Sequence, residues 1–163
     1  MNNTIKFLLS AVLAAMLSAC ALVENNPLDG HRAVYSWQGR GKIQFVCDYD
    51  ERGFYWRFLR QNGRLSTDAG EPRAELIGER NIKLPDGNVL ILTVNTVLRR
   101  PNTANAADLI YDVTNPALSG PWRQVVFVKR TATSGGMPLT GCSAAQRDKV
   151  LSVPFSARYI LYR

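Results

Sequence analysis

Three cysteines are the side chains of this chain with the clearest capacity for covalent chemistry. Cys20 follows a hydrophobic N-terminal segment, whereas Cys47 and Cys142 lie far apart in the remainder of the sequence. A thiol can carry a lipid, pair in a disulfide or act as a nucleophile. Each of these roles requires different neighbouring residues, so the sequence around each cysteine indicates its role.

The residues before Cys20 have the pattern of a lipidation signal. A short polar start is followed by an apolar to weakly polar stretch over residues 7–17. As a helix this stretch would span about 16 Å, roughly half a hydrocarbon core, so we do not expect a permanent transmembrane helix. The small residues Ser18 and Ala19 then resemble a bacterial lipobox, which predicts cleavage before Cys20 and lipidation of its thiol. An ordinary signal peptide with a plain cleavage site is the alternative.

Acylation of Cys20 would anchor the rest of the chain to a membrane. Each buried acyl methylene contributes about 0.8 kcal/mol, so two or three chains such as palmitate would hold the protein stably at the bilayer. By resemblance to lipoproteins of bacteria with two membranes, Ala21 lacks the aspartate associated with inner-membrane retention. We therefore expect the outer membrane, facing the periplasm. In an organism with one membrane, the same anchor would place the domain on the cell surface.

The other two cysteines, Cys47 and Cys142, are predicted to form a disulfide. The envelope outside the inner membrane is oxidising, and two thiols remain once Cys20 is acylated. The bridge would close a loop of about 95 residues. Two buried free cysteines are the alternative, and redox catalysis is disfavoured because the sequence contains no Cys-x-x-Cys pair.

The sequence offers few residues for an enzyme or metal site. His31 is the only histidine and lies in a segment predicted to be a tether, which argues against a Ser-His-Asp site and a histidine-rich metal site. Residues 48–53 resemble a calcium loop superficially, but Arg52 occupies a ligand position and Leu59 stands where the bidentate glutamate should be. We therefore expect neither a metal nor another cofactor.

Two further groups of side chains could form a site for a ligand or a substrate. Trp37, Trp56 and Trp122 could line a ligand cleft, although such residues more often belong to the core. Glu71 and Glu75 could flank a glycosidic bond, which would make the protein a hydrolase or lyase acting on envelope glycans. We favour the non-enzymatic interpretation, in which a β domain binds a ligand or partner, because no catalytic set accompanies the carboxylates.

The charge balance of the chain is basic but dispersed. The 163 residues carry a formal net charge of +7, which can draw a domain towards anionic lipid or glycan. However, the longest run of basic residues is Arg99-Arg100. We expect an ordinary solvated surface, with an envelope protein or an anionic glycan as the partner rather than a nucleic acid.

Beyond the signal, the sequence predicts a tether followed by β-strands. Residues 21–32 contain Asn-Asn-Pro and Asp-Gly turn signals and little apolar periodicity. Residues 42–48 and 54–59 alternate between apolar and polar, and a polar turn ending in Gly53 between them predicts a hairpin. Further strands are predicted over residues 74–77, 81–84, 88–98, 110–113, 124–131 and 159–162.

Short strands separated by glycine and proline turns predict an all-β fold. We expect a single antiparallel β-sandwich or barrel-like domain with at most one short helix, over residues 143–150. The polar residues near Arg130 are interpreted as the end of a strand, and residues 131–141 as a loop. The predicted organisation is therefore a lipoprotein signal peptide (1–19), an acylated N-terminus and tether (20–32) and one β domain (33–163).

Several segments occur together in a recognisable order. They are residues 128–138 with Cys142, residues 153–159, and, upstream, residues 39–47 followed by Trp56. From about residue 37 to the end, the chain resembles the domain of unknown function 3455 family. The resemblance implies an exported, mainly β domain whose cysteines include positions matching Cys47 and Cys142, and it implies no activity. Residues 78–81 depart from the family, which often has a histidine there, so no role for that histidine carries over.

Overall fold

The computed structural model describes residues 26–115 and 119–163. The predicted signal peptide and the lipidation site at Cys20 lie outside the described residues. Within the described ranges, no helix has the length and hydropathy needed to cross a membrane.

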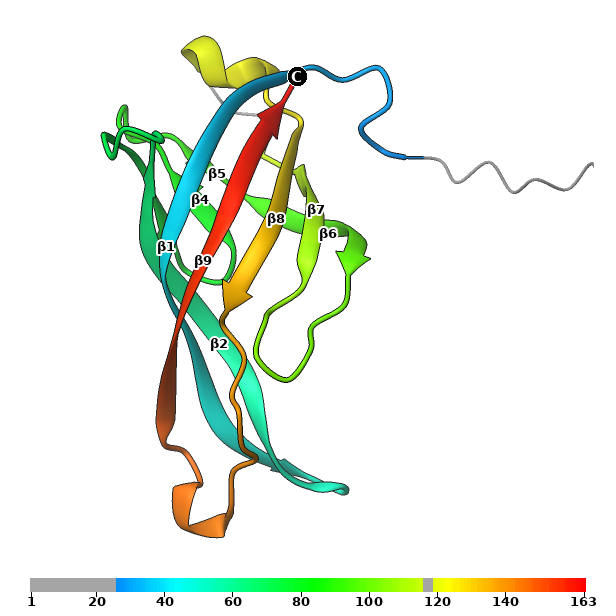
Figure 1. Cartoon of the computed structure of the whole chain (residues 1–163), viewed down its shortest axis with the longest axis vertical. Helices are drawn as coiled ribbons and strands as arrows, with labels where there is room; N and C mark the ends of the chain where they lie inside the picture. Colours follow the sequence, from blue (N-terminus) through cyan, green and yellow to red (C-terminus); the bar gives the residue numbers. More distant parts are fainter. Residues whose placement is uncertain (1–25, 116–118) are drawn as a thin grey trace, which may run out of the picture.

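Nine strands of the described residues form one antiparallel sheet in the order β5-β4-β3-β2-β1-β9-β8-β7-β6. The sheet curls into a nearly closed, barrel-like domain, in which β1, β9 and β8 run side by side along the long axis (Figure 1). The strands are β1 (Ala33–Asp50), β2 (Gly53–Ser66), β3 (Pro72–Ile77), β4 (Asn81–Lys83), β5 (Val89–Leu90), β6 (Leu92–Arg99), β7 (Asp108–Val113), β8 (Phe127–Gly135) and β9 (Val150–Tyr162). The predicted all-β fold is confirmed.

The long hairpin of β1 and β2 is the centre of the sheet. Along β1, the alternate residues Ile43, Phe45 and Cys47 are buried, as the alternation in the sequence predicts. The turn between the strands ends at Gly53, whose φ of 112° suits glycine. The predicted hairpin is therefore confirmed, and it is longer than the sequence pattern indicated.

Two glycines allow the central strands to approach closely. Gly41 of β1 lies opposite Gly63 of β2, and a Cβ atom on Gly63 would lie 2.5 Å from the carbonyl oxygen of Arg40 and 2.9 Å from the Cα atom of Gly41. Any side chain at this position would push the two strands apart. Paired glycines thus permit the sharp coiling of the sheet that a narrow barrel needs.

The two edges of the sheet meet at Ile91, the single residue between β5 and β6. Its carbonyl accepts a hydrogen bond from the backbone N–H of Thr114 at 2.9 Å, and its own N–H donates to Oδ1 of Asn115 at 2.9 Å. Asn115 also donates from Nδ2 to the carbonyl of Val89. The prediction of one strand over residues 88–98 is therefore wrong, because the chain passes from one edge of the sheet to the other at this point.

The C-terminal part contains more strand and less helix than predicted. β8 continues to Gly135 through an irregularity at Ala132, so the predicted loop over residues 131–141 begins too early. β9 spans 13 residues, because it pairs with both β1 and β8. The two-turn helix predicted over residues 143–150 is wrong, since only the 3-10 helix η2 (Ala144–Gln146) forms there. A second 3-10 helix, η1 (Gly120–Gln124), occupies the start of the strand predicted over residues 124–131.

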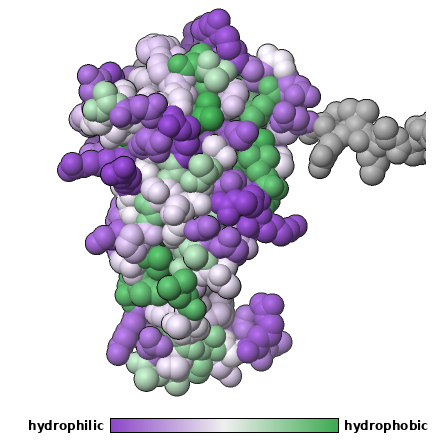
Figure 2. All heavy atoms as spheres, viewed as in Figure 1, coloured by the Kyte–Doolittle hydropathy of each residue, from purple (hydrophilic) through white to green (hydrophobic). Residues whose placement is uncertain are grey.

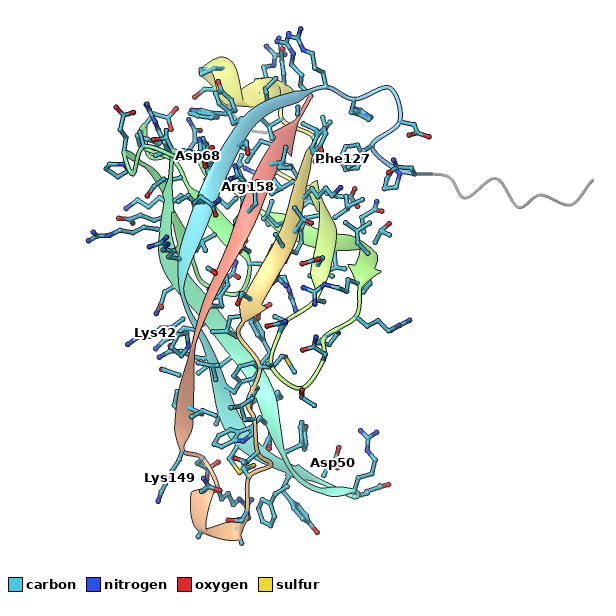
Figure 3. The ribbon with its side chains drawn as sticks, in the orientation of Figure 1. Lys42, Asp50, Asp68, Phe127, Lys149 and Arg158 are labelled. Carbon is cyan, nitrogen blue, oxygen red and sulfur yellow. A yellow bond between two sulfur atoms is a disulfide. The ribbon has the colours of Figure 1, made fainter. Side chains whose placement is uncertain are left out.

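Charged groups are dispersed over the outer face. Figure 2 shows hydrophilic residues in several groups, separated by apolar ones, on the side turned to the viewer. On the same side, the guanidinium of Arg158 donates to Oδ1 of Asp68 at 3.0 Å, and Lys42 is exposed (Figure 3). This side of the molecule therefore presents no single continuous basic surface among the described residues.

The sulfur atoms of Cys47 and Cys142 lie 2.15 Å apart, at disulfide distance, as the predicted bridge requires. Cys47 is completely buried on β1, and Cys142 is half-buried in the connection between β8 and β9. The bridge fastens this long connection to the central strand of the sheet.

Reduction of the bridge should lower the free energy of unfolding by about 4–5 kcal/mol, because the unfolded chain gains the freedom of a loop of about 95 residues. The measurement is urea unfolding with and without a thiol reductant. The double variant Cys47→Ala/Cys142→Ala is the control and should be insensitive to the reductant. Equal stability of oxidised and reduced wild-type protein would contradict the bridge.

Candidate functional site

A pocket of about 280 Å³ lies on the inner side of the curled sheet. Most of its lining is apolar and comes from β1, β2, β7 and the loop between β6 and β7, including Phe45, Phe58 and Leu109. Polar side chains in the lining are those of Gln61, Arg80 and Arg130. Three larger hollows, of about 460, 550 and 430 Å³, are more open and are lined mainly by exposed or half-exposed residues.

The most unusual residue of the pocket is Arg130 on β8, which is only 6% exposed. Its Nε and Nη2 atoms donate to the carbonyl oxygen of Ala107 at 3.2 and 2.8 Å. No described carboxylate lies within ion-pair distance of its guanidinium. An arginine cannot lose its charge at physiological pH, and a buried charge without a counter-ion destabilises a fold.

Several uncharged polar groups around Arg130 are buried without a protein partner. Gln61 is 1% exposed, and neither its Nε2 nor its Oε1 atom has a hydrogen bond within the described residues. The same holds for the hydroxyl groups of Tyr111 and Tyr159. Burial raises the pKa of both phenols, against the opposing effect of the Arg130 charge, so both stay neutral and able to donate or accept a hydrogen bond. Native proteins rarely leave so many buried polar atoms unpaired in one place.

Two irregularities in strand pairing place these side chains inside. Strand β2 has one extra residue, Leu59, opposite the step from Gln44 to Phe45 of β1. Before this bulge the even-numbered residues of β2 face inward, and after it the odd-numbered residues do. Gln61 therefore points inward, where unbroken alternation would have directed it outward. On β8, the irregularity between Thr131 and Ser134 lies just after Arg130. Bulges of this kind commonly redirect side chains beside binding sites.

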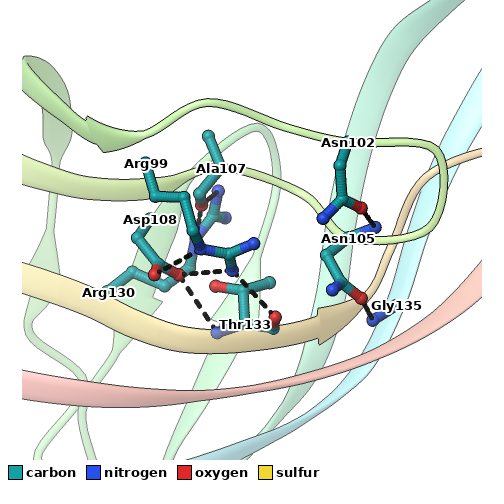
Figure 4. A network of polar contacts seen from close by, with 8 residues as sticks. All are labelled: Arg99, Asn102, Asn105, Ala107, Asp108, Arg130, Thr133 and Gly135. Atoms are coloured by element: carbon teal, nitrogen blue, oxygen red, sulfur yellow. Dashed lines mark hydrogen bonds and ion pairs between the residues drawn. The ribbon is translucent and has the colours of Figure 1, made fainter.

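A polar network fixes the loop between β6 and β7 against β8 (Figure 4). Asp108 accepts hydrogen bonds from Nε of Arg99 at 2.9 Å and from the backbone N–H of Thr133 at 3.0 Å. Further along the loop, Oδ1 of Asn105 accepts from the backbone N–H of Gly135 at 2.8 Å. The network holds the carbonyl of the intervening Ala107 in reach of Arg130.

The protonation of Asp108 follows from these contacts. Burial pushes the pKa of its carboxyl upward, but the hydrogen bonds from Arg99 and Thr133 outweigh burial and hold the pKa below its usual value. Asp108 is therefore ionised at neutral pH. Its carboxylate is occupied by Arg99 and Thr133 and makes no ion pair with the guanidinium of Arg130, although its charge favours the charged form of that arginine.

The structure separates the three tryptophans predicted to line a cleft. Trp56 lines the pocket and donates from Nε1 to the carbonyl of Thr140 at 3.0 Å. Trp37 and Trp122 pack together elsewhere, with ring centroids 6.1 Å apart. Trp56 of β2 pairs with Cys47 of β1. Cys47 lies ten residues beyond Trp37 on the same strand, which is about 30 Å in extended conformation. The three residues therefore do not share one cleft.

The other residues considered from the sequence lie outside the pocket. Glu71 pairs with Arg73 at 2.5 Å, and Glu75 lies opposite Lys83 at an outer hollow. The His31 ring packs against Phe127, with centroids 4.8 Å apart. Within the described ranges, no group of three or more His, Cys, Asp or Glu side chains is arranged to hold a metal ion.

Sequence reasoning missed Arg130 and Gln61. The available signal for Arg130 was its position two residues after Val128, on the inward face of a β-strand. The interpretation of these residues as the polar end of a strand is wrong, because β8 continues to Gly135. Gln61 gave no signal, since a bulge that the sequence does not mark brings it inside.

Comparison of the chain with protein-family models, with curated proteins and with solved structures gives no match. The resemblance noted from the sequence stays a prediction, and function has to be argued from the site itself.

The variant Asp108→Asn should lower the free energy of unfolding at pH 7 by about 1–3 kcal/mol, because a charge-assisted hydrogen bond to Arg99 is lost. The folded pKa of Asp108 lies below its unfolded value, so its contribution is complete above pH 3.8 and is lost as pH falls through the folded pKa. Urea unfolding at several pH values should therefore show the difference between wild type and variant narrowing in acid. Asp148→Asn, at an 86% exposed side chain, is the control. A difference independent of pH would contradict this role.

Proposed function

We propose that this chain is an exported, lipid-anchored protein of the bacterial envelope whose β domain binds a small ligand in the pocket at Arg130. The observation that supports ligand binding is the combination of a charged and an amide side chain, both buried and incompletely paired, in the lining of one pocket. Hydrogen bonds from a ligand to these groups would offset the free-energy cost of burying them.

The anchor is supported by the sequence around Cys20. Export would place the domain in the oxidising compartment that favours a bond between Cys47 and Cys142. The proposed tether, residues 20–32, can extend to at most about 45 Å, so the domain would work close to its membrane. We propose the periplasmic face of the outer membrane as its location.

The pocket favours binding over catalysis. Its described polar side chains are an amide and two guanidinium groups, and neither type exchanges a proton readily at neutral pH. A general acid, a general base or a nucleophile is therefore missing from the described lining. The alternative of a glycan hydrolase gains no comparable support, since Glu71 is paired with Arg73.

Lipid anchoring predicts the mass and location of the protein in its own cells. The mature chain should begin at Cys20 with the added mass of a diacylglycerol group, with or without a third acyl chain, and it should fractionate with membranes. The variant Cys20→Ser should lose both the lipid and the membrane association. Intact-mass analysis decides the matter: a product that retains Met1, or that begins elsewhere without lipid, would contradict the proposal.

Ligand binding predicts that a small molecule accompanies the protein purified from its envelope. Native mass spectrometry should show an adduct that disappears on denaturation, and the released molecule should raise the melting temperature when added back. Absence of an adduct, together with no thermal shift in envelope extract, would contradict a binding role.

A further inference from the structure

We infer that the pocket selects a monocarboxylate with an apolar body, of about the size of a medium-chain fatty acid. This inference rests on the proposed ligand-binding function and names the chemistry of the ligand. Three features of the pocket carry it: the charge of its lining, the unused donors of Arg130 and the apolar remainder of its wall.

The charge of the pocket favours an anion. The charged side chains in its described lining are Arg80 and Arg130, and both are cations. The guanidinium of Arg80 lies over the Phe58 ring, 5.0 Å from the centroid, and its Nη1 atom lies 3.7 Å from Oε2 of the exposed Glu79. The nearest buried carboxylate, on Asp108, is occupied by Arg99 and Thr133. An entering anion would therefore meet a guanidinium that has no ion pair among the described residues, in a poorly solvated setting where the attraction is strong.

The hydrogen-bond donors of Arg130 suit a carboxylate. A guanidinium has five N–H groups, and those directed at Ala107 come from Nε and Nη2. Nη1 donates no hydrogen bond of good geometry within the described residues, and the one nearby hydroxyl, on Tyr159, is itself left without such a bond. Two parallel N–H groups match the two oxygens of a carboxylate, and the amide of Gln61 offers a further unpaired donor in the same lining.

The size and the walls of the pocket restrict the rest of the ligand. Its volume of about 280 Å³ lies near the lower end of the range for small-molecule sites. Ile43, Phe45, Phe58, Leu109 and Met137 contribute apolar surface around the polar end. An apolar chain or ring fits this lining, whereas a sugar or a nucleotide would leave its hydroxyl groups unpaired against it.

Three probes that share an eight-carbon chain and differ in their head group test the inference: octanoate, 1-octanol and octylammonium. Each is titrated by calorimetry into the full chain in lipid nanodiscs. Empty nanodiscs serve as the blank. Octanoate should bind at least tenfold more tightly than octanol, and octylammonium should not bind. Arg130→Met should reduce the affinity for octanoate tenfold or more and leave octanol unchanged, while Arg130→Lys should restore part of the loss. Lys42→Gln removes an exposed charge from the outer face and should change nothing.

A second variant covers the case in which Arg130→Met fails to fold. Arg80→Gln, at a partly exposed side chain, should weaken octanoate binding severalfold without affecting octanol. Equal binding of octanoate and octanol, or unchanged octanoate binding in the arginine variants, would overturn the inference and leave a binding function standing. Failure of all three probes beside a co-purified ligand of other chemistry would also overturn the inference alone. Failure of the probes together with the absence of any co-purified ligand would overturn the proposed function as well.

Discussion

The buried guanidinium of Arg130 is the constraint around which the interior of this protein is organised. It carries a permanent charge, it is 6% exposed, and its hydrogen-bond partner within the described residues is the carbonyl of Ala107. Apolar residues of similar volume often stabilise a core more than a buried charge does. A role in the proposed ligand binding would account for an arginine at this position and for the unpaired amide of Gln61 in the same pocket.

The remainder of the fold holds this charge in place. Asp108 and Asn105 fasten the loop between β6 and β7 to β8, which keeps Ala107 beside Arg130. A bulge at Leu59 turns Gln61 inward, and the crossing at Ile91 joins the two edges of the sheet. Strands thus supply the polar groups, so the proposed binding site would have little conformational freedom to lose when a ligand binds.

The sequence predicted those parts of the structure that depend on local alternation. The hairpin of β1 and β2 follows from apolar residues at every second position, and the all-β class follows from many such segments. The break at Ile91 and the full length of β9 depend on pairing between distant strands, which periodicity does not report. The pocket was not predicted because its polar residues also depend on strand pairing. A bulge turns Gln61 to the inner face, and Arg130 was interpreted as the polar end of a strand that in fact continues. Trp56 is the one tryptophan among the described residues that line the pocket.

If Arg130 serves ligand binding, its charge should contribute nothing to the stability of the ligand-free fold. The deciding measurement is the free energy of unfolding of ligand-free wild type and of Arg130→Met, in urea at pH 7. The methionine variant should be at least as stable as wild type, because the substitution removes a buried charge that has no ion pair, at nearly constant volume. A loss of about 3 kcal/mol would instead show that the guanidinium is a fully compensated part of the core, and that its role is structural.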